Sequence, residues 1–135
     1  SFSTKEILFV WTALFINLIL IVNFFLKTFW GRARPGDLLK FGGKDHFSPW
    51  YQISDACTSN CSFVSGDAAV GFSLIVLYFV SNNLKYVYLS IIFGFLLGLI
   101  RIAEGGHFLS DVVFSAITVF FFSFIIKKYF INKLL

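Results

Sequence analysis

Long apolar runs, separated by polar stretches of unequal length, dominate the pattern of residues along this chain. Four apolar segments stand out, at Ile7–Leu26, Ala68–Leu84, Tyr86–Ile100 and Val112–Ile126. The first holds 20 uncharged residues, which as a helix reach about 30 Å, the thickness of the hydrocarbon core of a bilayer. The last two hold 15 residues each, reach about 22 Å and need their flanking residues to cross. The pattern therefore predicts an all-α, polytopic membrane helix bundle with four transmembrane helices.

Composition indicates that lipid rather than water surrounds this bundle. Of the 135 residues, 58% are hydrophobic and 13% are charged, whereas soluble domains carry about 25% charged residues. The 20 phenylalanines would overfill a core of this size surrounded by water. These values exclude an ordinary soluble enzyme, a disordered chain and a nucleic-acid scaffold. We expect the lipid bilayer as a partner, and no nucleic acid.

One segment between the apolar runs, residues 27–64, is too polar to span a membrane and too long for a plain connector. It contains Cys57 and Cys61, which we expect to form a local disulfide on the outer side of the membrane. Short turns join the other segments, so residues 1–135 are interpreted as one membrane-embedded domain. Because the chain begins at Ser1 and contains no methionine, we expect a processed chain or part of a longer one.

Lysine positions predict the orientation of the bundle. If every apolar segment crosses once, one side of the membrane receives five lysines, and that side is cytoplasmic by the positive-inside rule. They are Lys5, Lys85, Lys127, Lys128 and Lys133. The loop at 27–64 is then extracytoplasmic, and its own five cations run against the usual bias, which indicates that it binds an anion. Within it, Arg32 and Lys40 are interpreted as solvated or facing headgroups, and the aromatic residues, Phe41 among them, as an interfacial belt.

Residues with chemical potential lie at the outer ends of the predicted helices. They are Lys27, Arg34, Ser65, Gly66, Asp67, Arg101, His107 and Asp111. His107 and Asp111 are four residues apart at the start of a helix, so both side chains are expected on one face. A carboxylate there accepts a hydrogen bond from one imidazole nitrogen, which fixes the tautomer and leaves the other nitrogen free to attack.

The other candidate residues suit an anion. Ser65 and Gly66 open a helix with backbone N–H groups and a hydroxyl, and Lys27, Arg34 and Arg101 add three cations. Positioned cations stabilise the charge on phosphoryl oxygens during phosphate transfer. Two histidines and scattered carboxylates do not suit a two-metal site, so neither a metal nor another cofactor is predicted.

The spacing of these residues resembles the signature of the type 2 phosphatidic acid phosphatase family. That family belongs to a superfamily that also holds bacterial acid phosphatases and vanadium haloperoxidases, and its signature has three parts: K-x6-RP, PSGH and SR-x5-H-x3-D. The first part is matched in full by Lys27-x6-Arg34-Pro35. The second is matched at Ser65-Gly66 only, and the third by Arg101-x5-His107-x3-Asp111 without its leading serine.

This resemblance implies a six-helix bundle of which the chain is the C-terminal part, with its site facing the periplasm from a bacterial inner membrane. It implies that His107 is a nucleophile that forms a phosphohistidine and that Asp111 orients it. It also implies that the phosphoryl oxygens are held by Lys27, Arg34, Ser65, Gly66 and Arg101. Asp67 stands where the family has the histidine that protonates the leaving group. A protonated Asp67 would do the same, whereas a permanent carboxylate would repel the phosphate.

We therefore expect an integral membrane lipid phosphatase that acts without a metal on a phosphomonoester or pyrophosphate. Phosphatidic acid, phosphatidylglycerol phosphate, polyprenyl pyrophosphate and lipid A phosphates all fit. The alternative is a catalytically weak relative that binds anionic headgroups without turnover. A small transporter or channel subunit ranks lower, because the residues in the middle of the apolar segments are only mildly polar, such as Asn17 and Ser90.

Overall fold

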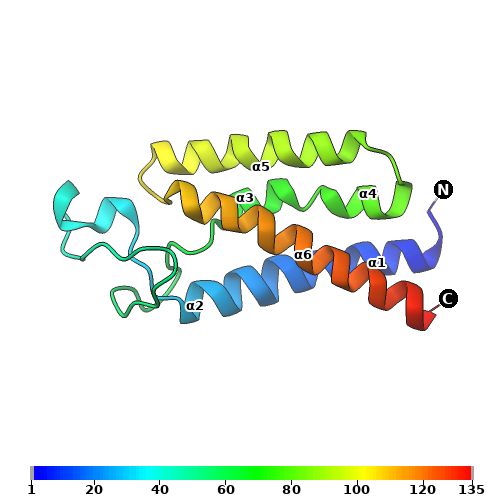
Figure 1. Ribbon diagram of the computed structural model, residues 1–135, viewed down its shortest axis with the longest axis horizontal. Coiled ribbons are helices and arrows are strands. Elements are labelled where there is room, and N and C mark those ends of the chain that lie inside the picture. The colour runs from blue at the N-terminus through cyan, green and yellow to red at the C-terminus, as the bar shows by residue number, and fades with distance from the viewer. Residues whose placement is uncertain (1, 135) are drawn as a thin grey trace.

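The structure is a computed structural model that describes residues 2–134, and it is helical along most of that length (Figure 1). The first helical stretch runs without a break through α1 (Thr4–Leu14), the π-helical η1 (Phe15–Leu26) and α2 (Lys27–Phe29). Two short 3-10 turns follow, η2 (Pro35–Asp37) and η3 (Leu39–Phe41). The remaining helices are α3 (Gly66–Phe72), α4 (Ile75–Ser81), α5 (Lys85–Ala103) and α6 (Leu109–Leu134). Because the described residues form no strand, the predicted all-α class is confirmed.

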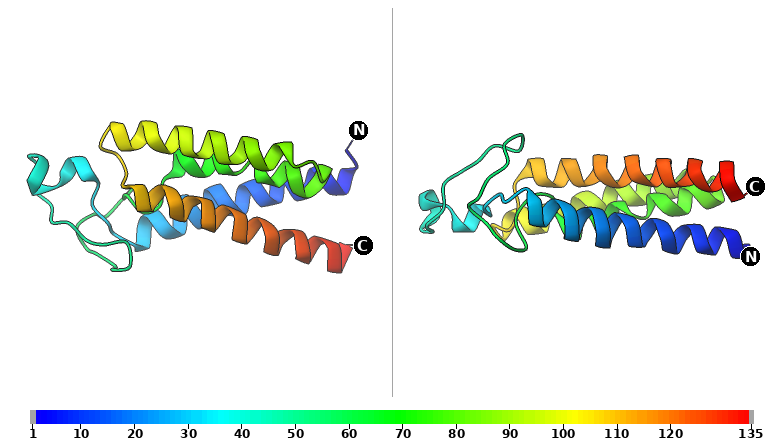
Figure 2. Two further views of the ribbon diagram at one scale, coloured as in Figure 1. Left: turned by 45° about the horizontal axis from the view of Figure 1, so that its top comes forward. Right: turned by 90° about the horizontal axis from the view of Figure 1, so that it is seen from below.

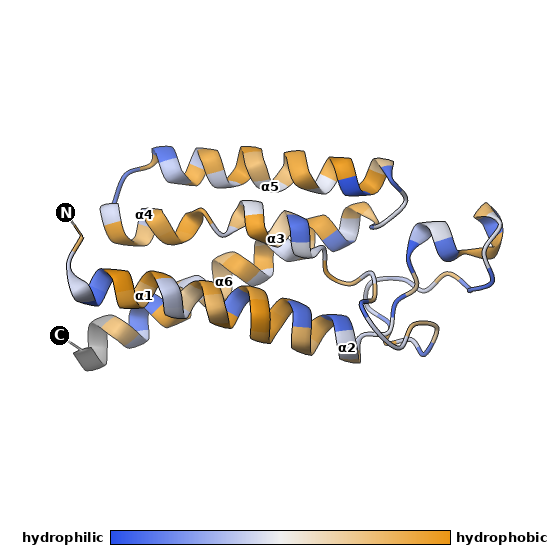
Figure 3. Cartoon of the chain, turned by 180° about the vertical axis from the view of Figure 1, so that it is seen from behind, coloured by the Kyte–Doolittle hydropathy of each residue, from blue (hydrophilic) through white to orange (hydrophobic). Residues whose placement is uncertain are grey.

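Three of these helical stretches are long and apolar enough to cross a membrane: Thr4–Phe29, Lys85–Ala103 and Leu109–Phe130. Most of their residues are not buried within the chain, and hydrophobic residues predominate along their length (Figure 3). Water would oppose the exposure of so much apolar surface, and lipid favours it. The chain is therefore an integral membrane protein.

The second predicted span, Ala68–Leu84, is shorter and less regular than expected. Its helix breaks between α3 and α4, and Gly66–Ser81 is too short to rank with the three candidate spans. It is also the most enclosed part of the bundle, since α3 packs against η1, α5 and α6 and buries Ala69 and Phe72 completely. Three spans are thus supported, and a fourth crossing stays a prediction.

Small residues allow these helices to approach closely. A Cβ atom placed on Gly71 of α3 would lie 2.6 Å from the Cα atom of Gly94 in α5. Buried Asn17 of η1 donates a hydrogen bond to the hydroxyl of Ser123 in α6 at 3.0 Å. Close backbones and polar side-chain bridges are how membrane helices associate without a hydrophobic driving force.

The loop after α2 and the turn between α5 and α6 lie at the same end of the bundle, and the two termini lie at the other (Figures 1 and 2). One backbone hydrogen bond joins these two segments directly, from the Gly36 N–H to the Gly105 carbonyl at 2.9 Å. This end of the molecule therefore gathers the start of α3, the end of α5 and the start of α6.

Candidate active site

A buried histidine lies at the centre of this end. His107, in the turn before α6, is 1% exposed, and its Nδ1 atom lies 2.7 Å from the carbonyl oxygen of Ser62. Since a carbonyl oxygen only accepts hydrogen bonds, Nδ1 is the nitrogen that carries the hydrogen. In the neutral ring, the lone pair is then on Nε2, the form that a nucleophilic histidine requires.

Asp111 does not orient His107 in the way its spacing predicts. Its Oδ2 atom lies 3.8 Å from Nδ1 of His107, beyond hydrogen-bond reach. Because α6 begins at Leu109, His107 lies outside the helix, and the two side chains approach each other without forming the expected hydrogen bond. Oδ2 instead accepts hydrogen bonds from the Ser62 hydroxyl at 2.5 Å and from the Phe108 N–H at 2.8 Å. The carboxylate therefore holds His107 indirectly, through the residue whose carbonyl the imidazole contacts.

Arg32 is the partner of that carboxylate, and the interpretation of Arg32 as a solvated residue is wrong. It is 2% exposed, and its Nη1 atom lies 2.6 Å from Oδ1 of Asp111 and 2.8 Å from the Ser110 hydroxyl. Its Nε donates to the Ser48 carbonyl at 2.9 Å, and its guanidinium carbon lies 4.0 Å from the centroid of the Phe108 ring. An arginine can be buried here because its charge is paired and most of its donors are used.

Sequence reasoning missed Ser62 as well as Arg32. Neither residue belongs to the three motif parts, and their partners are 49 and 79 residues away along the chain. The one available signal was a cation on the side of the membrane where cations are scarce. That signal is shared by all five cations of the loop, so it does not single out Arg32.

Lys27 is nearly buried at the end of the first helical stretch. It is 7% exposed, and its Nζ atom donates to the side-chain oxygen of Asn60 at 3.2 Å. A Cβ atom on Gly66 would lie 3.2 Å from the same Nζ atom. The ammonium group is thus placed against the start of α3, where glycine leaves room for it.

Ser65 has a structural role in the described state. It is the N-cap residue of α3, and its hydroxyl accepts a hydrogen bond from the Ala68 N–H at 3.4 Å. Its carbonyl accepts a hydrogen bond from Ser115 at 2.6 Å, and its N–H donates to the Asp111 carbonyl at 3.2 Å. These contacts fix the first turn of α3 to α6, next to His107.

The two motif arginines differ in how their charge is compensated. Arg34 donates to the backbone carbonyl of Asn60, at 2.8 Å from Nη2 and 3.2 Å from Nε. Arg101 forms ion pairs with Asp67, at 3.0 Å, and with Glu104. A carbonyl does not neutralise the positive charge of a guanidinium, whereas carboxylates do. A phosphate would therefore find the charge of Arg34 uncompensated, and it would have to compete with Asp67 and Glu104 for the charge of Arg101.

The loop segment before α3 is cross-linked to the rest of the site. Cys57 and Cys61 form the expected disulfide, with their Cα atoms 5.6 Å apart. The next residue, Ser62, donates its N–H to the Arg32 carbonyl at 2.9 Å. Among residues 2–134, no cluster of three His, Cys, Asp or Glu side chains is arranged to hold a metal ion.

Comparison with known proteins yields a family and several relatives. The family model described as "PAP2 superfamily" matches residues 7–134. The chain is similar to proteins named lipid A 4'-phosphatase. The one from Francisella tularensis subsp. novicida (strain U112) is 40% identical over 126 residues, which is 90% of this chain and 57% of that protein. The one from Rhizobium leguminosarum is 41% identical over 113 residues, which is 79% of this chain and 48% of that protein.

A third protein of the same name, from Rhizobium etli, is 40% identical over 114 residues, or 80% of this chain and 44% of that protein. The chain therefore spans about half the length of the curated relatives it matches. No solved structure matches it.

Proposed function

This chain belongs to the PAP2 superfamily, and from that premise we propose that it is a membrane phosphatase that hydrolyses a phosphomonoester of a lipid. The names of its relatives favour lipid A among the substrates that the sequence leaves open, with the 4'-phosphate as the group removed. One observation carries the proposal: the hydrogen bond from Nδ1 of His107 to the Ser62 carbonyl, which leaves a lone pair on Nε2.

In the proposed reaction, Nε2 of His107 attacks the phosphorus atom. An N–P bond forms while the P–O bond to the lipid breaks, and the leaving oxygen takes a proton from Asp67, which in this proposal has left Arg101 and become protonated before the step. Water then attacks the phosphohistidine and gives a proton to the Asp67 carboxylate, so that the N–P bond breaks, inorganic phosphate is released, and the imidazole and Asp67 return to their starting forms. Asp111 and Ser62 keep the imidazole in place during both steps.

The cations around His107 are proposed to hold the transferring group. Lys27 donates to the side-chain amide oxygen of Asn60, and Arg34 donates to the backbone carbonyl of the same residue. Both acceptors are neutral, so these contacts leave the charges of Lys27 and Arg34 uncompensated. Arg101 would join them by exchanging carboxylate partners for phosphoryl oxygens. Its ion pairs are partly exposed, and such pairs contribute only about 0–1 kcal/mol. The Ser65–Gly66 backbone completes the proposed phosphate-binding set.

A headgroup-binding relative without turnover is the alternative, and the Asp67–Arg101 ion pair is the observation that favours it. A carboxylate held by Arg101 occupies a cation that phosphate needs and adds negative charge beside it. In that case the protein would bind the lipid phosphate and leave it intact.

Release of inorganic phosphate separates these functions. The full-length protein in detergent would be given lipid A, phosphatidic acid and phosphatidylglycerol phosphate, with and without a chelator, and with His107→Ala as the control. We expect phosphate from lipid A that persists with the chelator and disappears in the variant. Binding of lipid A by a folded protein that releases no phosphate would support the alternative instead.

A further inference from the structure

Part of the outer loop folds into a rigid platform next to His107. Within residues 35–47, the Asp45 N–H donates to the Asp37 carbonyl and the Leu39 N–H donates to the Asp45 carbonyl, both at 2.9 Å. Gly36 fastens this platform to the α5–α6 turn through its hydrogen bond to Gly105. The side chains that the platform displays are therefore held in place before any ligand arrives.

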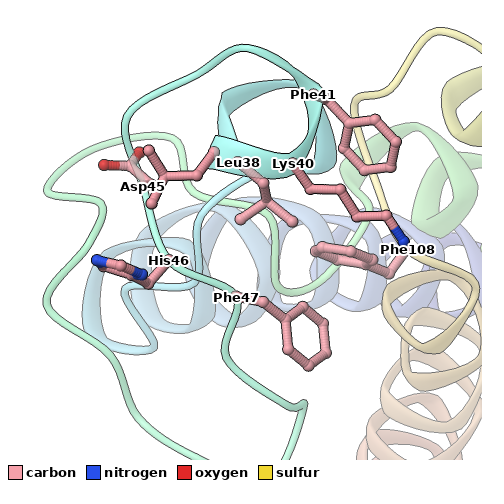
Figure 4. Close-up of a pocket in the computed structure, with 8 residues that line it drawn as sticks. Leu38, Lys40, Phe41, Asp45, His46, Phe47 and Phe108 are labelled. Atoms are coloured by element: carbon pink, nitrogen blue, oxygen red, sulfur yellow. The ribbon is translucent and has the colours of Figure 1, made fainter.

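A pocket of about 460 Å³ lies between this platform and the start of α6 (Figure 4). It is lined by Leu38, Leu39, Lys40, Phe41, Asp45, His46, Phe47 and Phe108. Its volume falls within the range of about 300–1,000 Å³ that is usual for small-ligand sites. His107 itself does not line the pocket, but Phe108, the next residue in the chain, does, and its N–H donates a hydrogen bond to Asp111 at 2.8 Å.

Arg32 couples the pocket to the site. Its guanidinium carbon lies 4.0 Å from the centroid of Phe108 and 5.6 Å from that of Phe47, both of which line the pocket. The same guanidinium binds Asp111. One side chain therefore supports the aromatic walls of the pocket and the carboxylate behind His107.

The chemistry of the lining is mixed. Phe41 and Phe47 are 63% and 61% exposed, although they lie on an irregular loop and not on a membrane-spanning helix. The lining also includes Lys40, Asp45 and His46, which carry an ammonium group, a carboxylate and an imidazole. Within the described part of the chain, the side chains of Asp45 and His46 have neither a hydrogen-bond nor an ion-pair partner. Aromatic ring faces beside unpaired polar groups suit a ligand that has both C–H faces and hydroxyl groups. A sugar is such a ligand.

The position of the pocket excludes an acyl chain as the occupant. The platform extends beyond the ends of the helices (Figures 1 and 2), whereas acyl chains run alongside them. A part of a substrate lipid that reached this pocket would lie farther from the membrane than the acyl chains. This geometry requires a lipid with a large headgroup.

We propose that the pocket binds the sugar headgroup of a phosphorylated glycolipid while His107 faces the phosphate of the same molecule. The proposal rests on the proposed function and assigns the site at which the sugar part of its favoured substrate, lipid A, is bound. Phe41, Phe47 and Phe108 contact the ring faces, and Asp45 accepts hydrogen bonds from hydroxyl groups. Phosphatidic acid has no group that reaches the pocket.

The binding of lipids that carry no phosphate group tests this inference independently of catalysis. The full-length protein in detergent would be titrated with dephosphorylated lipid A and with diacylglycerol. The variants are Phe41→Ala and Asp45→Asn, and the control is Tyr51→Ala, an exposed aromatic residue of the same loop outside the pocket lining. We expect Phe41→Ala to weaken glycolipid binding by about two- to tenfold, since an aromatic contact contributes about 0.5–1.5 kcal/mol and 1.4 kcal/mol is a tenfold change in affinity. We expect Tyr51→Ala to leave it unchanged.

Two results would overturn the inference. One is an equal loss for glycolipid and diacylglycerol in Phe41→Ala, which would make the ring part of an interfacial belt. The other is unchanged glycolipid affinity in both Phe41→Ala and Asp45→Asn. Neither result depends on turnover, so failure of phosphate release would remove the proposed function without deciding the pocket.

Discussion

At the scale of single residues, Arg32 links the parts of the site. It joins the loop to Ser110 and Asp111 at the start of α6. Through Asp111 it also supports Ser62, whose carbonyl holds the imidazole of His107. Removing one member of a buried ion pair leaves the other charge uncompensated, at a cost of about 3–5 kcal/mol.

We expect Arg32→Gln to reduce the amount of folded protein and Arg32→Lys to fold but to lower kcat at least tenfold. Lysine retains the charge but cannot contact Asp111, Ser110 and Ser48 together. Lys44→Gln, at an exposed position of the same loop, is the matched control. Steady-state kinetics with lipid A as the substrate measure kcat for each variant. Wild-type kcat in Arg32→Lys would show that the network does not position His107.

Asp67 stands where the family signature has the histidine that protonates the leaving group. If Asp67 protonates the leaving group, Asp67→Asn removes the proton and should lower kcat by about 10²–10⁴-fold. Asp67→His should retain turnover, because histidine also donates a proton. Phosphate release from lipid A by both variants checks this. If the wild-type protein shows no turnover and Asp67→His does, the headgroup-binding alternative would be established instead.

The motif spacing made the candidate residues visible, but it did not reveal which of them touch. Lys27, Arg34, Arg101 and His107 could be named because the members of each motif lie within a few residues of one another along the chain. The contacts of Asp111 could not be inferred in this way. They depend on where α6 begins and on how the loop folds back over it, which are tertiary features with no local signal.

At the scale of elements, close packing of α3 against α5 sets the position of the site. α3 is short and enclosed, and its first turn carries Ser65 and Gly66 to Lys27. Hydropathy predicted this segment as a span because its residues are apolar. Burial by neighbouring helices and burial by lipid give the same apolar pattern, so sequence does not distinguish them.

We expect Gly71→Ala to lower the stability of the folded protein by about 1–3 kcal/mol. The added Cβ atom would lie 2.6 Å from backbone atoms of Gly94, so the two helices must move apart. Val70→Ala, at an exposed neighbouring position, should have little effect. Thermal unfolding in detergent measures both. Equal melting temperatures for Gly71→Ala and the wild type would contradict the described packing.

At the scale of the whole molecule, the cations of the outer loop and the lysines near the other end of the bundle define two faces. We propose that the face with His107 is periplasmic, because the lysines at the opposite face follow the positive-inside rule. The native cysteines are joined in a disulfide, which leaves single introduced cysteines as clean probes.

We expect Lys44→Cys to react with a membrane-impermeant thiol reagent in intact spheroplasts and Lys85→Cys to react only after lysis. Both positions are exposed, so access across the membrane decides the outcome. Mass spectrometry of the purified protein measures the label. The reverse pattern would place the site in the cytoplasm and would contradict the proposed orientation.

The nucleophilic role of His107 is tested most directly by trapping its phosphorylated form. Full-length protein would be mixed with lipid A labelled with ³²P at the 4'-phosphate, quenched in alkali within milliseconds, digested and mapped. We predict a label on the peptide with His107 that survives alkali and is lost in acid, as a phosphoramidate bond requires, and no label in His107→Ala. Steady phosphate release by the wild type without label on His107, or label that persists in His107→Ala, would contradict the mechanism.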